Sequence, residues 1–162
     1  MTPQDAIKLG LDSAQFLMTT YLSDLSDDEL RIRPLPGMNH IAWQLGHLIV
    51  SERDMASAVG AKIPELPAGF ADAHTMDAAK SDNSQQFTTK QAYLELFATI
   101  RAAALASLAA TPASKLSEPS PEKMRSYAPT VAAVYTLLGT HQMMHVGQWV
   151  ALRRKLNKPV VI

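Results

Sequence analysis

The segment 131–156 constrains the fold more than any other part of the chain, because its pattern is helical over its whole length. Residues recur at steps of four and three and form one continuous stripe: Val134, Leu138, His141, His145, Gln148 and Leu152. Residues with this spacing lie on one face of an α-helix. Thr130 is suited to cap the helix, and the cations at 153–155 suit the negative end of its dipole. We therefore expect a long helix that carries two histidines on its buried face.

Other segments also combine a helical period with an apolar stripe: residues 2–24, 39–58 and 88–111. The expected N-caps, in the same order, are Thr2, Asn39 and Thr88, the last in a capping box with Gln91. Pro3 is also well placed at the first position of its helix, since its fixed φ suits that turn. The sequence therefore predicts four helices.

The segments between these helices shape the expected topology. Residues 60–87 form an unusually long connection, which is expected to be either a crossover along the molecule or a functional lid. Residues 113–129 hold three prolines and form a second irregular connection, and the tail 159–162 is expected to dock as an extended strand. The sequence predicts an all-α fold in a single domain, residues 1–162, as a four-helix bundle with a long crossover between helices 2 and 3.

The composition excludes several classes of partner and site. Lysine plus arginine equals aspartate plus glutamate, at 15 each, so the chain has no net charge to attract nucleic acid. The sequence has no cysteine, which excludes disulfides, thiolate ligands and a cysteine nucleophile. We find no apolar stretch near the ~18 residues of a membrane span and no secretion signal at the N-terminus. The expectation is a soluble, cytoplasmic protein without membrane or nucleic-acid partners.

Two histidines one turn apart suggest a metal site. His141 and His145 lie on the same helical face, so a single ion could bind both. The best third ligand is His47, because 39–58 is also amphipathic and carries this histidine beside its apolar face. Three neutral imidazoles leave coordination positions open for a water or a substrate atom, as catalytic sites do. His40 could substitute for His47 as the third ligand. Its place in the first turn of the helix instead favours a position at the rim of the site or in contact with the substrate.

Neighbouring residues suggest how such a site would be supported. Gln44 and Gln148 are candidates to orient an imidazole or a bound water. Trp43 could form a pocket wall, although packing in the core is the better expectation. The same expectation of core packing applies to Met143, Met144 and Trp149.

The remaining polar candidates are expected to lie in water. His74 stands among polar residues of the long connection, and Glu52 and Asp54 are charged residues on the turns after His47. A carboxylate near the metal is the alternative for Glu52 and Asp54. The residue after His141 is a glutamine, so the general base of an HExxH motif is absent, which argues against peptide hydrolysis.

These motifs resemble the DinB/YfiT superfamily of metal-binding four-helix bundles. The resemblance rests on Trp-x-x-x-His-Leu at 43–48, His-x-x-x-His-x-Gly-Gln at 141–148 and Leu-Arg-Arg at 152–154, and it covers essentially the whole chain. It implies that His47, His141 and His145 are the metal ligands, that the helices run up-down-down-up, and that homodimers are common. Characterised relatives include transferases and isomerases that use bacillithiol, mycothiol or glutathione, with the metal activating the thiol.

Three classes of function follow from this interpretation. The first is a divalent-metal-dependent enzyme acting on a small molecule, as a thiol S-transferase or alternatively as a hydrolase. The second is a non-catalytic metal-binding or stress-response protein with a closed or empty site, and the third is an interaction scaffold. Imidazole ligands suit zinc, nickel, iron and copper. Zinc or nickel is the expected cofactor, joined by a low-molecular-weight thiol in the transferase hypothesis.

Overall fold

The computed structural model describes residues 1–161, and the side chain of Ser84 lies outside that description. Four long helices make up most of the described chain: α1 (Pro3–Leu22), α3 (Ile41–Ala58), α4 (Lys90–Ala110) and α6 (Val131–Lys155). The shorter elements are α2 (Asp27–Leu30), α5 (Ala113–Leu116) and the 3-10 turns η1 (Asp72–His74), η2 (Ala78–Lys80), η3 (Ser84–Gln86) and η4 (Glu122–Met124). Apart from one isolated bridge, residues 1–161 contain no β-structure. The predicted all-α class is confirmed.

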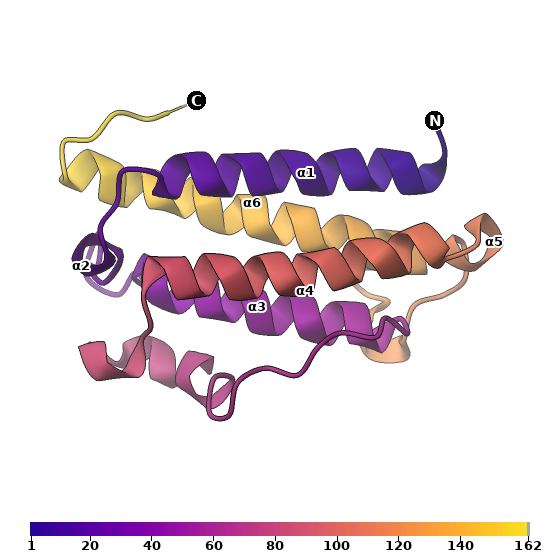
Figure 1. The fold of residues 1–162 in the computed structure, drawn as a ribbon, viewed down its shortest axis with the longest axis horizontal. Helices are drawn as coiled ribbons and strands as arrows, with labels where there is room; N and C mark the ends of the chain where they lie inside the picture. The colour runs from indigo at the N-terminus through magenta and orange to yellow at the C-terminus, as the bar shows by residue number, and fades with distance from the viewer. Residues whose placement is uncertain (162) are drawn as a thin grey trace.

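The four long helices lie alongside one another (Figure 1). In that view α1 and α6 run from right to left, whereas α3 and α4 run from left to right. Helix α1 packs against α6 and α4, and α3 packs against the same two helices. The segment 59–89 returns along the length of α3 before α4 begins. Helices α3 and α6, which carry the predicted ligands, are therefore direct neighbours.

The N-caps agree with the sequence patterns at two helices and differ at two. Thr2 caps α1 and Thr130 caps α6, as predicted. The cap of α3 is His40 rather than Asn39, because Nδ1 of His40 accepts the Trp43 backbone N–H at 3.1 Å. The cap of α4 is Thr89, one residue after the predicted Thr88. Sequence patterns do not separate adjacent threonines, and an imidazole is not among the common caps.

A buried polar network joins the four long helices near their middle. Arg101 of α4 pairs with Glu52 of α3 through two hydrogen bonds, of 2.6 and 2.8 Å. The same guanidinium donates to the Leu11 backbone oxygen of α1 at 3.0 Å and to Oε1 of Gln142 of α6 at 2.8 Å. Glu52 was expected to face water but is only 3 % exposed. Its burial is tolerated because the guanidinium satisfies both carboxylate oxygens.

Helix α4 corrects the expectation that no segment could span a membrane. By length and composition alone, its 21 residues are long and apolar enough to cross one. Glu95 and Arg101 interrupt its apolar residues, so the sequence shows no continuous apolar run here. In the fold, the helix lies against α1 and α3 and buries that arginine in an ion pair. About a third of its apolar window, 33 %, is buried in the fold.

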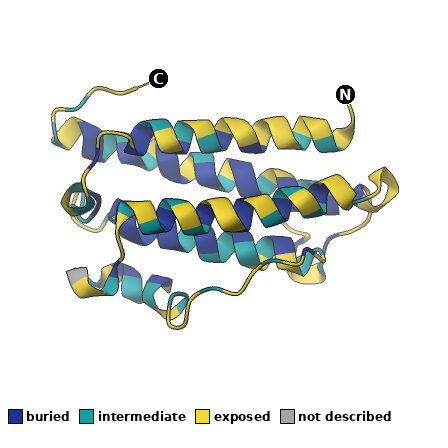
Figure 2. Ribbon diagram, in the orientation of Figure 1, coloured by how far each residue is buried: buried dark blue, intermediate teal, exposed yellow. Residues whose placement is uncertain are grey.

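Buried residues recur along each of the long helices, between exposed ones (Figure 2). Trp149 is fully buried, as expected, but Met144 is 56 % exposed because Gln142, Val146 and Trp149 lie on the core side of α6. The tail is held by a 2.7 Å hydrogen bond from Arg153 to the Pro159 carbonyl oxygen. Residues 159–161 form no strand, and the remaining residue of the predicted strand, Ile162, lies outside the described residues.

Candidate metal centre

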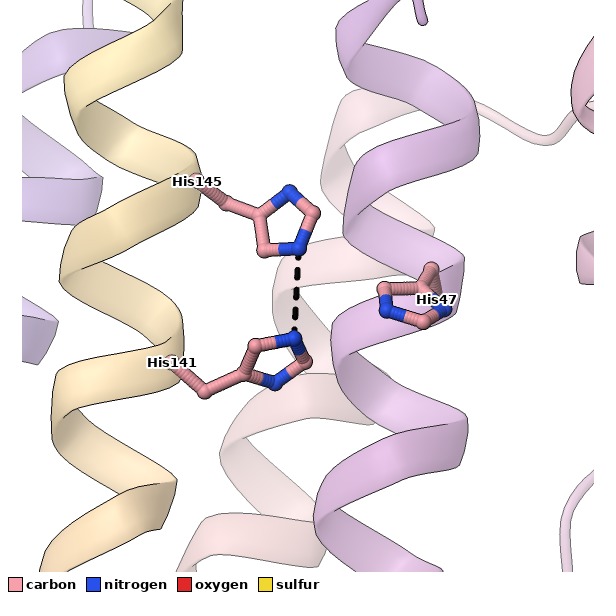
Figure 3. Close-up of side chains that lie close together, drawn as sticks. All are labelled: His47, His141 and His145. Atoms are coloured by element: carbon pink, nitrogen blue, oxygen red, sulfur yellow. Dashed lines mark hydrogen bonds between the residues drawn. The ribbon is translucent and has the colours of Figure 1, made fainter. Parts of the chain in front are cut away.

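Three imidazoles converge between α3 and α6 (Figure 3). His141 and His145 project from successive turns of α6, and His47 faces them from α3. Each ring can offer one nitrogen, and the three nitrogens all lie within 4.8 Å of one another. The structure therefore brings together the three histidines that the sequence pattern selected, and this cluster could hold a metal ion.

The spacing of His141 and His145 fits a common ion. The Nε2 atoms of His141 and His145 are 3.2 Å apart. Two nitrogens that are each about 2.1 Å from one ion lie roughly 3.0 to 3.4 Å apart, depending on the coordination angle. The His47 ring lies at 5.3 and 5.2 Å from the two other ring centroids. An all-imidazole donor set suits zinc, nickel, iron or copper and does not select one of them.

Gln44 holds the ring of His145 in position. Its Oε1 atom lies 3.0 Å from Nδ1 of His145, and Nε1 of Trp149 donates to the same oxygen at 2.9 Å. The amide nitrogen of Gln44 in turn donates to the Asn39 backbone oxygen at 2.8 Å. Because an amide oxygen only accepts, the neutral ring of His145 carries its proton on Nδ1. The lone pair on Nε2 therefore points into the cluster, as a metal ligand requires.

Trp43 supports His47 and connects it to the long connection. The Trp43 and His47 rings are stacked, with centroids 4.9 Å apart and planes 11° apart. The indole N–H of Trp43 donates to the Thr75 backbone oxygen at 3.0 Å. Trp43 was expected in the core, and it is 1 % exposed. It is thus both a core residue and the surface on which the His47 ring rests.

His74 packs against the backbone next to His47. It was expected to be solvated, but it is 5 % exposed and bonded through both ring nitrogens, to the Phe70 backbone oxygen at 2.7 Å and to the Tyr93 hydroxyl at 2.8 Å. A Cβ atom at Gly46 would lie 1.9 Å from Cδ2 of His74. Only glycine at position 46 allows this approach. A glycine inside a helical pattern beside a candidate ligand was the sequence signal for this contact.

Burial favours the neutral form of all three imidazoles. It lowers the pKa of His141 to about 4, with a further contribution from His47. It lowers the pKa of His145 to about 3, with contributions from His141 and then His47. The pKa of His47 is also lowered by burial. Since metal binding needs the unprotonated ring, the cluster is ready to accept a cation near neutral pH.

A pocket of ≈ 410 Å³ opens beside the cluster, and it has a mixed lining: His47, Ser51, Asp54, Met55, Tyr127, Leu137 and His141. His145 is not part of this lining and lies deeper, at 7 % exposure. The cluster is thus enclosed on the side of Gln44 and accessible on the side of the pocket. This arrangement leaves room for an additional ligand from solution.

Other residues singled out in the sequence lie away from the three nitrogens. His40 caps α3 and is buried against Phe87, at a ring distance of 4.5 Å, instead of lying at a rim. Gln148 is half-buried and, within the described chain, makes no hydrogen bond to a histidine. Asp54 is exposed in the pocket lining. The sequence patterns missed Tyr127, which reaches the pocket from the second irregular connection.

A comparison with protein families places these features in context. A family model described as the DinB superfamily matches residues 11–149, which include all three histidines of the cluster. No curated protein matches the chain, and no solved structure does either.

Proposed function

Because the chain belongs to the DinB superfamily, we propose that it binds a divalent metal ion through His47, His141 and His145 and acts on a small molecule. The proposed reaction is a transfer of the thiol S-transferase type, with a low-molecular-weight thiol as the nucleophile. Zinc or nickel is the proposed metal.

The position of the cluster beside an open pocket is the observation that carries this proposal. A closed structural site would surround the three imidazoles with protein on every side. Here His47 and His141 also line a pocket of ≈ 410 Å³. That volume is within the range of small-molecule sites. The accessible side therefore favours an enzyme over a purely structural metal site.

The metal and the residues around it would have separate roles in this reaction. A bound divalent cation would lower the pKa of a thiol or water ligand. Gln44 keeps Nε2 of His145 unprotonated and directed at the cluster, and Trp43 fixes the plane of His47. Met55 and Leu137 give the pocket apolar walls. The chain has no cysteine to compete with a substrate thiol.

A metal-dependent hydrolase is the second candidate. Asp54 favours it, because this carboxylate lines the same pocket and could act as a general base. Glu52 does not offer this chemistry, since both of its oxygens accept hydrogen bonds from Arg101. We rank the transferase first because the characterised relatives that the sequence resembles include thiol-dependent transferases.

The proposal also covers the topology of the bundle, the oligomeric state, the cellular location and the partners of the protein. The helix directions in Figure 1 support an up-down-down-up four-helix bundle with segment 59–89 as its long crossover. A homodimer, a cytoplasmic location and the absence of nucleic-acid and membrane partners are further parts of the proposal. The balanced charge of the chain supports the exclusion of nucleic acid.

Elemental analysis of untagged protein tests the metal site. We expect one equivalent of a divalent metal per wild-type chain and its loss in His47→Ala. His40→Asn is the matched control, because it keeps a capping side chain outside the cluster and should retain the metal. Metal retained in both variants would refute the three-histidine site. A screen of thiols against electrophilic acceptors, with His145→Ala as the inactive reference, then separates transferase from hydrolase.

A further inference from the structure

We propose that the pocket beside the three histidines recognises substrates that carry an ammonium group, and that Asp54 binds this group. The inference rests on the proposed function, because it places the metal-binding end of the substrate at the histidine cluster. It adds the charge and the approximate extent of the other end.

The pocket lining has an order along α3. His47, Ser51, Asp54 and Met55 are spaced by four, seven and eight residues from the first, so they share one face of the helix. Asp54 is two turns beyond His47, roughly 10 Å along the helix axis. Side chains on a helix lean toward its N-terminus, so the carboxylate of Asp54 leans back toward the cluster. A ligand held at the cluster can therefore extend along α3 to Asp54.

Asp54 is the one carboxylate in this lining, which includes no lysine or arginine. The other walls are a serine, the apolar side chains of Met55 and Leu137, and the ring of Tyr127, which is 60 % exposed. A carboxylate and an aromatic face both attract an ammonium group. The pocket thus suits a substrate with an apolar body and a cationic end.

Asp54 keeps one oxygen for such a ligand. Its Oδ1 atom lies 2.9 Å from Nε of Arg53, and the side chain of Asp54 is 58 % exposed. Its Oδ2 atom has no partner within the described part of the chain. Arg53 is absent from the pocket lining. Exposed ion pairs between neighbours are weak, so this pair leaves the carboxylate available to a second cation.

Cobalt-loaded protein allows this recognition to be measured without turnover. Co²⁺ stands in for zinc, and a thiol that binds it gives a sulfur-to-cobalt charge-transfer band. The probes are 6-aminohexane-1-thiol, 6-mercaptohexan-1-ol and 6-mercaptohexanoic acid, which share one chain length and differ in the charge of the far end. Titration of the band gives a Kd for each thiol with wild type, Asp54→Asn, Arg53→Gln and Asp12→Asn. Asp12 is the matched control, since it is a half-exposed helical aspartate paired with a neighbouring cation, Lys8, outside the pocket.

In wild type we expect the amine to bind about two- to fivefold more tightly than the alcohol, and the acid to bind most weakly. Asp54→Asn should bring the amine and the alcohol to equal affinity, Arg53→Gln should increase the preference for the amine, and Asp12→Asn should match wild type. An amine preference that survives in Asp54→Asn, or one that is absent from wild type, would overturn the role of Asp54 while leaving the metal site intact. The absence of a charge-transfer band with every thiol would instead overturn the open site of the proposed function, and this inference with it.

Discussion

Nδ1 of His145 lies 3.0 Å from Oε1 of Gln44, although the two residues belong to different helices, α6 and α3. The contact decides which nitrogen of His145 faces the cluster. It also ties the pairing of the two helices to the protonation state of a candidate ligand. A small displacement of α3 against α6 would therefore change which nitrogen of His145 carries the proton, as well as the shape of the site.

Replacing Gln44 tests this contact. Gln44→Leu removes the acceptor for His145 and Trp149, and we expect metal affinity to fall about 10- to 100-fold. Gln44→Glu keeps an acceptor and should retain most of the affinity. Competition with a chromophoric chelator measures both, and thermal melts of the metal-free variants separate affinity from folding. Equal affinity in Gln44→Leu and wild type would show that the contact does not support the site.

Gly46→Ala tests the approach of His74 to α3. The added Cβ atom would lie 1.9 Å from the His74 ring, so the ring must leave its position and lose its bonds to Phe70 and Tyr93. We expect a loss of about 1–3 kcal/mol in the free energy of unfolding, measured with urea. Gly10→Ala is the control, because no atom lies within 4 Å of its added Cβ atom.

The double variant Gly46→Ala/His74→Ala completes this test. Removing the imidazole removes the clash. His74→Ala should therefore lower the free energy of unfolding less in the Gly46→Ala background than in wild type. Strict additivity of the two single effects would contradict the contact.

Arg101→Met tests the buried network. It leaves the Glu52 carboxylate buried without its partner, and such losses cost about 3–5 kcal/mol in the free energy of unfolding. The double variant Glu52→Leu/Arg101→Met removes both charges and should recover most of that loss. Urea midpoints of the single and double variants measure the effect. A mild loss in Arg101→Met would mean that water reaches Glu52.

Acid should destabilise the metal-free protein in a defined window. The pKa of His141 is lowered to about 4 and that of His145 to about 3, both chiefly by burial. In the unfolded chain the pKa of histidine is about 6.5, so the unfolded state takes up protons first as the pH falls. The histidine contribution to stability is therefore complete above pH ~6.5 and is lost progressively below it.

Urea unfolding at pH 7.5 and 5.5 measures this loss. The metal-loaded protein should be more stable than the metal-free protein at both pH values, because the metal binds the folded state. It should lose at least as much stability over this interval, because the unfolded state takes up the same protons. In metal-free His145→Gln the dependence on pH should be weaker, since one titrating ring is absent. An unchanged dependence in that variant would assign the acid sensitivity to other groups.

Local patterns predicted the helices well, and they predicted the caps only in part. Thr2 and Thr130 cap their helices as expected, because a hydroxyl before a helix bonds an N–H a few residues ahead, whatever the rest of the fold does. His40 was missed as a cap because an imidazole seldom has that role. The prediction that His74 lies in water was wrong for a different reason. Its polar neighbours in the chain do not indicate that it packs against α3.

The sequence by itself determined the helical class, the shared face of His141 and His145, and the choice of His47 as their partner. These follow from the fixed rotation per residue of an α-helix and from the chemistry of imidazole. Only the tertiary structure decided that α3 lies beside α6, that Gln44 selects the tautomer of His145, and that a pocket opens at His47. The physical reason is that these contacts join residues far apart in the chain, and their geometry depends on how all the helices pack together.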